Sequence, residues 1–338
     1  MSRIYKYQQS IKRFIINKST LHKDINSQSN LNEDILNEIK KEINVLVTQS
    51  DMILPILFLT IMGNLNRKNN ITIQGFYVAS SIEYLIWICG YLKNNNQNNS
   101  YLKNIIIYML SINIYKSIEL NIDTLSRTLD NNKFIKIYSK IKSTINDRIK
   151  IPFINWSNIE YISNEKKKKI DIYRYFLKDK VELKKKFDQI KIIKKNDIIK
   201  IIKNNIGYIS GISCVLGWLF GCGDIKLSEK AKQCGILFGI LYTISIDFNN
   251  IQKDIENAVH NNNVSINYVI NTGFHKSYEN YLDYKQQFIT LCLTLDIYTS
   301  TIKEILELID KKVDMSINNT YPDLKSDASS SYTNTISV

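Results

Sequence analysis

The sequence predicts an all-α protein, a single large helical bundle in which two central helices are buried on every side. Three observations favour this fold class. Helix-breaking residues are rare, because the 338 residues include only three prolines and eleven glycines. Apolar residues recur at helical spacing along most of the chain. Seven of the eleven glycines fall between residues 207 and 239, which indicates closely packed helices there.

The chain begins with a basic segment, residues 1–29. Its first 23 residues contain no acid, and Ile4, Tyr7, Ile11 and Phe14 can share one helical face. This pattern predicts an ordinary basic first helix of a cytoplasmic protein. It is also similar to an organelle transit peptide, so import into an organelle stays open.

The helical domain is expected over residues 30–315. Asn32 offers a cap to its first helix, which carries an apolar stripe. Residues 51–64 are apolar almost all round, with Pro55 near the start, where a helix tolerates proline. A second mostly apolar helix covers residues 73–92.

A polar break at residues 93–99 separates that helix from one or two further helices over residues 101–129. In residues 166–203, lysines alternate with apolar residues, which predicts a solvated helix face. A net charge of +13 permits binding to nucleic acid or anionic lipid, but no nucleic-acid recognition motif accompanies the lysines. Residues 316–338 are rich in Ser, Asn, Thr and Asp, and predict a disordered tail.

Two uncharged stretches, residues 204–223 and 233–246, are the predicted central helices. The first approaches the length that spans a bilayer, but its polar residues and five glycines favour burial inside a bundle. The glycines form pairs four residues apart. Glycine in a helix costs about 1 kcal/mol relative to alanine, so repeating it on one face indicates that another helix backbone or a ligand comes very close. The paired glycines are Gly207 and Gly211, Gly217 and Gly221, and Gly235 and Gly239.

The positions of the cysteines and histidines indicate neither a redox-active thiol pair nor a metal site. The five cysteines form no CxxC pair and predict reduced, buried thiols. The three histidines share no ligand spacing, so no zinc site is expected.

Several segments together resemble the trans-isoprenyl diphosphate synthases, the polyprenyl synthetase family. The run NIGYISGISCVLGWLFGCG, a short polar connector and AKQCGILFGILYTISIDFNN resemble the second half of that family. Three other segments resemble family helices in the same order along the chain: MILPILFLTIMG, ASSIEYLIWICGYL and NYVINTGFHKSYENY. The resemblance covers residues 30–310 and implies an isoprenoid-synthase fold, a dimer and Mg²⁺-dependent prenyl transfer.

The family's metal ligands are largely missing. Its members hold Mg²⁺ and an allylic diphosphate between two aspartate-rich DDxxD motifs, because hard cations prefer anionic oxygen ligands. Counted from Glu83, the first motif falls on Lys93–Gln97 (KNNNQ), which contains no carboxylate. The second falls on Ile246–Asn250 (IDFNN), which retains one. Mg²⁺ is therefore implied by the resemblance and disfavoured by the residues.

Asp247 is the remaining metal-ligand candidate, and no catalytic residue can be assigned. Asp254 lies about two helical turns further on, so both carboxylates could share a helix face. The resemblance implies that the remnant of the family's substrate pocket is surrounded by Glu83, Lys93, Asn94, Tyr242, Thr243, Asn249, Asn250 and Asp254.

Three functions are compatible with this sequence. The favoured one is a non-catalytic relative of the prenyl diphosphate synthases, which acts as a partner subunit or binds an isoprenoid or other apolar ligand. Such a subunit would form a homodimer, or a heterodimer with an active synthase. The first alternative is an active prenyltransferase that condenses allylic and isopentenyl diphosphates at an atypical metal site. The second is an unrelated helical interaction protein, associated with a membrane surface.

Overall fold

The computed structural model describes residues 2–27, 32–93, 100–146, 159–259 and 262–320, and confirms the all-α fold class. No strand occurs in these ranges apart from two isolated β-bridges. The helices are α1 (Arg3–Asn17), α2 (Thr20–Ser27), α3 (Glu33–Gln49), α4 (Ile53–Lys68), α5 (Phe76–Lys93), α6 (Ser100–Thr128), α7 (Asn131–Asn146), α8 (Asn164–Lys167), α9 (Ile172–Tyr175), α10 (Val181–Gln189), α11 (Lys195–Ile202), η2 (Lys203–Gly207), α12 (Tyr208–Phe220), η3 (Ile225–Leu227), α13 (Ser228–Asn249), α14 (Ile251–Ala258), α15 (Tyr268–Thr272), α16 (Phe274–Thr294) and α17 (Ser300–Thr320).

The chain divides into two compact units, each assembled from separate stretches of sequence. The first unit contains Met1–Pro152, Tyr208–Gly235 and Leu291–Ile305. The second contains Phe153–Gly207, Ile236–Thr290 and Leu306–Val338. The division falls within α13, α16 and α17.

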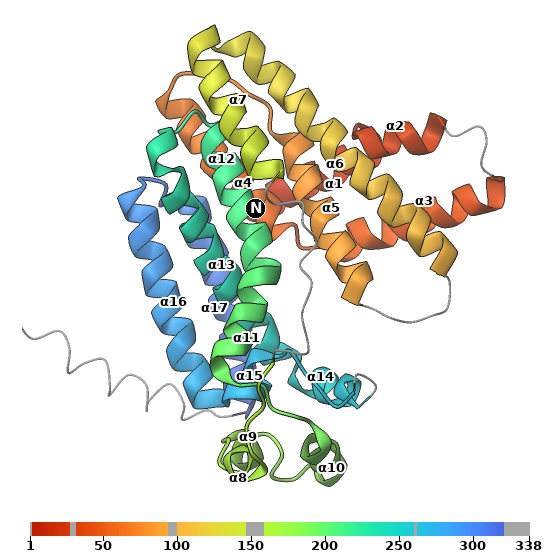
Figure 1. The fold of residues 1–338 in the computed structure, drawn as a ribbon, viewed down its shortest axis with the longest axis vertical. Helices are drawn as coiled ribbons and strands as arrows, with labels where there is room; N and C mark the ends of the chain where they lie inside the picture. Colours follow the sequence, from red (N-terminus) through yellow and green to blue (C-terminus); the bar gives the residue numbers. More distant parts are fainter. Residues whose placement is uncertain (1, 28–31, 94–99, 147–158, 260–261, 321–338) are drawn as a thin grey trace, which may run out of the picture. The chain divides into compact units, whose positions relative to one another are not determined.

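The core of the first unit is built around α4. Its residues from Ile53 to Met62 are all buried, as the uncharged sequence predicts. Helix α4 packs against α12 and α5, and α5 packs against α6 (Figure 1). The Phe58 and Phe220 rings meet edge to face, with centroids 6.4 Å apart. Burial of these apolar side chains is the main stabilising contribution in this unit.

The glycines of α12 and α13 lie where helix backbones approach closely, as their spacing predicts. A Cβ atom on Gly217 would lie 2.9 Å from the Phe58 carbonyl oxygen in α4. A Cβ on Gly235 would lie 2.8 Å from the Gly211 Cα in α12. In the second unit, a Cβ on Gly239 would lie 2.5 Å from the Gly207 Cα. The glycines therefore serve helix packing, between α12 and α4, between α12 and α13, and between η2 and α13.

Helix α1 is an integral part of the first unit. It packs against α2, α3, α4 and α5, and buries Ile4, Ile11 and Ile15. Phe14 is partly exposed and stacks on Phe76, with ring centroids 5.5 Å apart. The predicted apolar face is thus present, with Ile15 as an additional buried member.

Helix α6 is one continuous helix of 29 residues. Within the described ranges, it is the one helix long and apolar enough to cross a membrane. Up to three such spans are found if two bent helix pairs are each counted as one. The stretch 204–223, considered above for its length, is interrupted by a kink at Asn205, and α12 begins only at Tyr208.

The lysine-rich region corrects one expectation, because it is not a uniformly solvated helix face. Residues 166–203 contain short helices, and Lys167 is buried with 4% of its surface exposed. Its Nζ donates hydrogen bonds to the carbonyl oxygens of Phe187, Asp188 and Ile190 at 2.6, 2.9 and 2.7 Å. The Lys167 side chain thus satisfies backbone carbonyl groups at the C-terminal end of α10, which lack helical partners.

Two further predictions, on the C-terminal tail and on the cysteines, can be compared with the structure. Helix α17 continues to Thr320, five residues into the segment assigned above to the tail, and residues 321–338 lie outside the described ranges. None of the five cysteines forms a disulfide bond; four of them are buried, and Cys89 is partly exposed.

Candidate functional site

The carboxylate of Asp247 lies at a sharp corner of the chain. Helix α13 ends at Asn249, α14 begins at Ile251, and the helix axis bends by 82° between them. Asp247 is buried, with 8% of its surface exposed. Its Oδ2 accepts a hydrogen bond from the backbone N–H of Tyr268 at 2.7 Å. The carboxylate therefore stabilises the N-terminal turn of α15, where backbone N–H groups lack helical partners.

Asn267 joins the two carboxylates of this corner. Its Nδ2 donates to the Asp247 carbonyl oxygen at 2.9 Å and to Asp254 Oδ2 at 2.8 Å. Its Oδ1 accepts from the Ile270 N–H at 3.1 Å and so caps α15. The bend at Asn250 corrects the expectation that Asp247 and Asp254 share a face of one helix. The two residues are brought together by the amide between them.

The environment of Asp254 disfavours its charged form. Burial raises the pKa of Asp254, while the hydrogen bond from Asn267 and the nearby Lys253 lower it. A carboxylate that already accepts a side-chain amide hydrogen bond has lost part of its capacity to bind a cation.

A second asparagine extends this network. Asn271 Nδ2 donates to the carbonyl oxygens of Ser265 and Asn267, and its Oδ1 accepts from the Ile193 N–H at 2.7 Å. Neither Asn267 nor Asn271 was predicted from the sequence as a site residue. An asparagine directly before the apolar run Tyr268–Ile270 is a cap signal, and it could have identified Asn267.

The other predicted pocket residues of the second unit lie on α13 and at its end. Thr243 Oγ1 donates back to the Gly239 carbonyl at 2.8 Å, and Lys312 Nζ lies 5.9 Å from the centre of the Tyr242 ring. Asn249 is exposed, and its Nδ2 donates to the carbonyl oxygens of Ser245 and Lys312 at 2.9 and 3.2 Å. Asn250 occupies the position before α14 and makes no side-chain cap there.

Glu83 lies in the first unit, in the middle of α5, with 1% of its surface exposed. Its Oε1 accepts from the Ser50 hydroxyl at 2.5 Å, whereas its buried Oε2 has no hydrogen-bond partner within the described residues. Burial raises the pKa of Glu83 from 4.5 to about 7, although the Ser50 hydrogen bond opposes the shift. Lys93 ends α5, its side chain is not described, and Asn94 lies outside the described ranges.

These residues do not fit a cluster of magnesium ions. Among the described residues, no group of three or more His, Cys, Asp or Glu side chains could hold a metal ion. At the α13–α14 corner, each of the two aspartates already accepts a hydrogen bond from an N–H group. Mg²⁺ prefers near-octahedral oxygen coordination with carboxylate ligands, and the two aspartates of this corner are already engaged in hydrogen bonds.

No protein-family model and no curated protein matches this sequence. Solved structures do match it. A geranyltransferase from Helicobacter pylori 26695 has a TM-score of 0.56 and 13% identity, over 92% of this chain and 96% of its own. The chain has the fold of the trans-isoprenyl diphosphate synthases. This confirms the fold expected from the sequence resemblance.

Two other solved structures give the same result. A geranyltranstransferase from Thermotoga maritima has a TM-score of 0.54 and 11% identity, over 91% of this chain and 99% of its own. An FPP/GFPP synthase from Zymomonas mobilis has a TM-score of 0.55 and 10% identity, over 92% and 99%. These likenesses show that the chain shares the prenyl synthase fold.

Proposed function

We propose that this chain is a non-catalytic protein with the prenyl synthase fold, which acts as a subunit in a dimer. The hydrogen bond from the Tyr268 N–H to Asp247 Oδ2 carries the first part of this proposal. It assigns the one carboxylate left in the second motif to holding α15, in a buried position. Asp254 is engaged by Asn267 in the same network.

Electrostatics support the same conclusion. Each charge-assisted hydrogen bond contributes about 1.5–3 kcal/mol, so replacing several carboxylates by amides removes most of the attraction for clustered cations. The segment at the first motif position contributes Lys93, whose charge repels cations. Prenyl transfer that depends on a magnesium-bound diphosphate lacks its usual ligands in this chain.

The outer face of α6 supports the second part of the proposal. Tyr101, Tyr108 and Tyr115 are 67%, 66% and 47% exposed. They are seven residues apart, about two helical turns, so they form one stripe. Aromatic residues are enriched at protein interfaces, and a contiguous exposed apolar patch marks such a surface. We propose that a second copy of this chain covers this stripe.

An enzyme assay tests the non-catalytic part. Purified protein is mixed with an allylic diphosphate, isopentenyl diphosphate and Mg²⁺, and release of pyrophosphate is followed. We expect no release above that of a matched Asp247→Ala variant. Magnesium-dependent release by the wild-type chain that this variant lacks would establish the alternative of an active prenyltransferase.

Light scattering coupled to gel filtration tests the dimer. We expect the wild-type chain to be dimeric and Tyr108→Glu to raise the dissociation constant about tenfold or more, as loss of a central aromatic contact does. Tyr5→Glu is the matched control, because Tyr5 is 46% exposed on α1. A monomeric wild-type chain, or equal weakening by both variants, would contradict the proposed interface. A monomer that pairs with an active synthase would point to the heterodimer instead.

Binding of an isoprenoid is a second candidate function. It is favoured by the fold likeness to the H. pylori geranyltransferase, whose structure is also solved in complex with magnesium and isoprenyl diphosphate at a TM-score of 0.56. Binding of an isoprenoid alcohol without Mg²⁺ would support this second function. The absence of such binding would contradict it, and only the subunit role would remain.

A further inference from the structure

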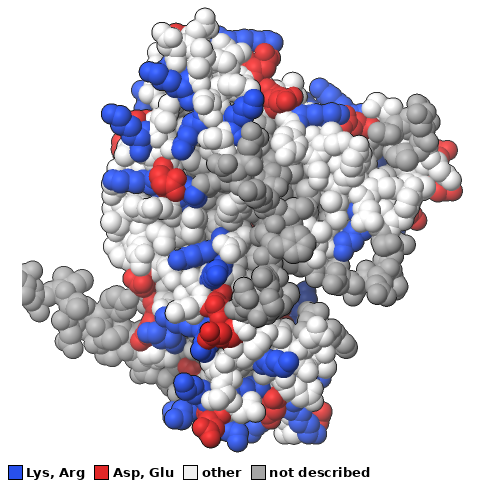
Figure 2. Space-filling model, in the orientation of Figure 1, with Lys and Arg blue, Asp and Glu red and all other residues white. Residues whose placement is uncertain are grey.

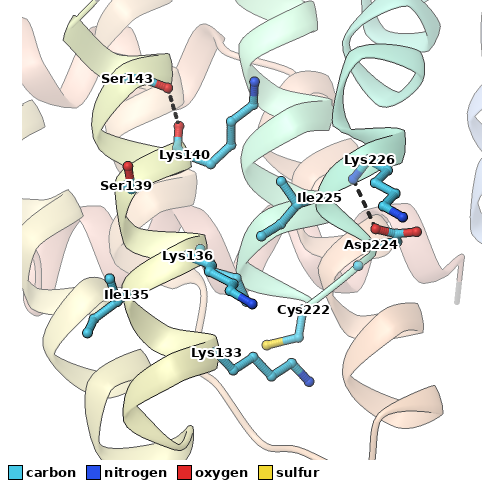
Figure 3. A pocket seen from close by; sticks show the side chains of 12 residues that line it. Lys133, Ile135, Lys136, Ser139, Lys140, Ser143, Cys222, Asp224, Ile225 and Lys226 are labelled. Carbon is cyan, nitrogen blue, oxygen red and sulfur yellow. Dashed lines mark hydrogen bonds between the residues drawn. The ribbon is translucent and has the colours of Figure 1, made fainter.

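A basic pocket of the first unit lies outside the motif positions discussed so far. It has a volume of about 800 Å³ and is formed by α7 and by the connector between α12 and α13 (Figure 3). The residues that line it are Lys133, Ile135, Lys136, Ile137, Ser139, Lys140, Ser143, Cys222, Gly223, Asp224, Ile225 and Lys226.

The inner part of the basic pocket is apolar. Helix α7 packs against α12, and Ile137 and Cys222 are 2% and 7% exposed. Ile225 is half-buried on the side of the connector. Such a surface can bury a hydrocarbon portion of a ligand.

The rim of the basic pocket is cationic. Lys133, Lys136 and Lys140 lie three and four residues apart on α7, so they share one helix face, and Lys226 joins them from η3. None of the four forms an ion pair with a described residue, although other lysines of this chain, such as Lys116 and Lys194, do. In Figure 2 most lysines and arginines are spread over the visible face among acidic residues. Unpaired lysines around one hollow produce a local positive potential.

The single carboxylate of the basic pocket is partly engaged. Asp224 Oδ1 accepts the backbone N–H of Lys226 at 2.9 Å, and caps the turn that begins η3. One aspartate therefore faces four lysines, and the balance of charge still favours an anion.

We propose that this pocket binds a phosphate-bearing ligand. The lysines of α7 and Lys226 hold the phosphate, and an apolar portion of the ligand lies against Ile137 and Ile225. Lysine binds phosphate as a point charge, so a group of lysines can bind different phosphate esters with little discrimination between them. The phosphate has two sources with the same chemistry, a soluble organic diphosphate and the headgroup of an anionic lipid.

Charge reversal on α7 tests the proposal with the full-length chain. Inorganic pyrophosphate is titrated by calorimetry without Mg²⁺, and flotation is measured with phosphatidylcholine vesicles that contain or lack phosphatidic acid. Lys136→Glu should weaken binding about tenfold or more, because it replaces an attraction by a repulsion. Lys142→Glu is the matched control, since Lys142 is exposed on the same helix but does not line the pocket.

The two ligands distinguish the source. Pyrophosphate binding that Lys136→Glu weakens indicates a soluble diphosphate, and vesicle binding that it weakens indicates a lipid headgroup. Equal effects of the two variants, or no binding of either ligand to the wild-type chain, would overturn the proposal. Circular dichroism of each variant confirms that the helices remain intact.

Cys222 supplies an independent readout. Its side chain lies in the basic pocket, and in Figure 3 Lys133 and Lys136 extend from α7 toward it. Burial raises the pKa of the Cys222 thiol and Lys133 lowers it. Bound pyrophosphate should slow alkylation of Cys222 several-fold, measured by mass spectrometry. Cys89, on α5, is the internal control and should be unaffected. Unchanged alkylation of Cys222 at saturating pyrophosphate would contradict the proposed site.

Discussion

The glycine contacts of α12 and α13 differ in kind from the polar corner around Asp247. At the glycines, the sequence specifies shape, because backbones approach so closely that a Cβ atom would overlap its neighbours. At the corner, the sequence specifies hydrogen bonds, and each polar group is matched to a particular backbone or amide partner. The comparison teaches that a prenyl synthase fold depends on its close helix packing, whereas the carboxylates at a motif position can be used for structure.

The largest loss of stability is expected when a side chain is added at one of the glycine contacts. Gly235→Leu should lower the free energy of unfolding by more than about 4 kcal/mol, because the side chain meets the backbone of Ser210 and Gly211. Gly90→Leu is the control, since no atom lies within 4 Å of a Cβ built there. Urea denaturation measures both. Similar stabilities of the two variants would mean that α12 and α13 do not pack as described.

Glu83 extends the comparison to a third kind of site, because it is a buried carboxylate whose Oε1 accepts a hydrogen bond from Ser50. Its pKa of about 7 in the folded state exceeds the ordinary value of 4.5. The folded protein therefore binds this proton more tightly than the unfolded chain, and stability falls as pH rises from 4.5 through 7. Glu83→Gln should remove this loss and raise the free energy of unfolding at pH 8 by about 3 kcal/mol.

The pH profile provides the control for Glu83→Gln. At pH 4 the wild-type chain and the variant should have nearly equal stability, because both side chains are then neutral. A constant difference between them from pH 4 to pH 8 would show that Glu83 does not change its charge within this range.

A smaller effect is expected at Asp247. Asp247→Ala leaves the buried Tyr268 N–H without its acceptor and should lower the free energy of unfolding by about 2 kcal/mol. Asp283→Ala is the matched control, because Asp283 is an exposed residue whose side chain, among the described residues, accepts a hydrogen bond from Gln287 on its own helix. Its effect should stay within about 0.5 kcal/mol. Equal losses of stability in Asp247→Ala and Asp283→Ala would contradict the structural role proposed for Asp247.

The helices and their buried faces could be predicted because apolar periodicity and glycine spacing act locally. Residues 51–64 and the three glycine pairs are examples, and the structure places each of them in a helix-packing contact. The same local reasoning failed for residues 166–203, where the buried Lys167 binds three carbonyl groups that lie 20, 21 and 23 positions further along the chain.

The polar corner could be predicted only in part. Asp247 was predicted from the motif position and Asp254 from its spacing to Asp247, but the 82° bend that separates their helices was not predicted. Asn267 lies 20 residues beyond Asp247, and nothing in the sequence specifies that its amide bridges both aspartates. Such partners depend on tertiary structure, which local sequence patterns do not contain.

Isothermal titration with a non-hydrolysable allylic diphosphate, with and without Mg²⁺, tests the central claim most directly. If Asp247 is a structural acceptor, Mg²⁺ adds nothing to the affinity, and any binding that remains is sensitive to Lys136→Glu. Binding that requires Mg²⁺ and that Asp247→Ala abolishes would contradict the account, because it would make Asp247 a metal ligand.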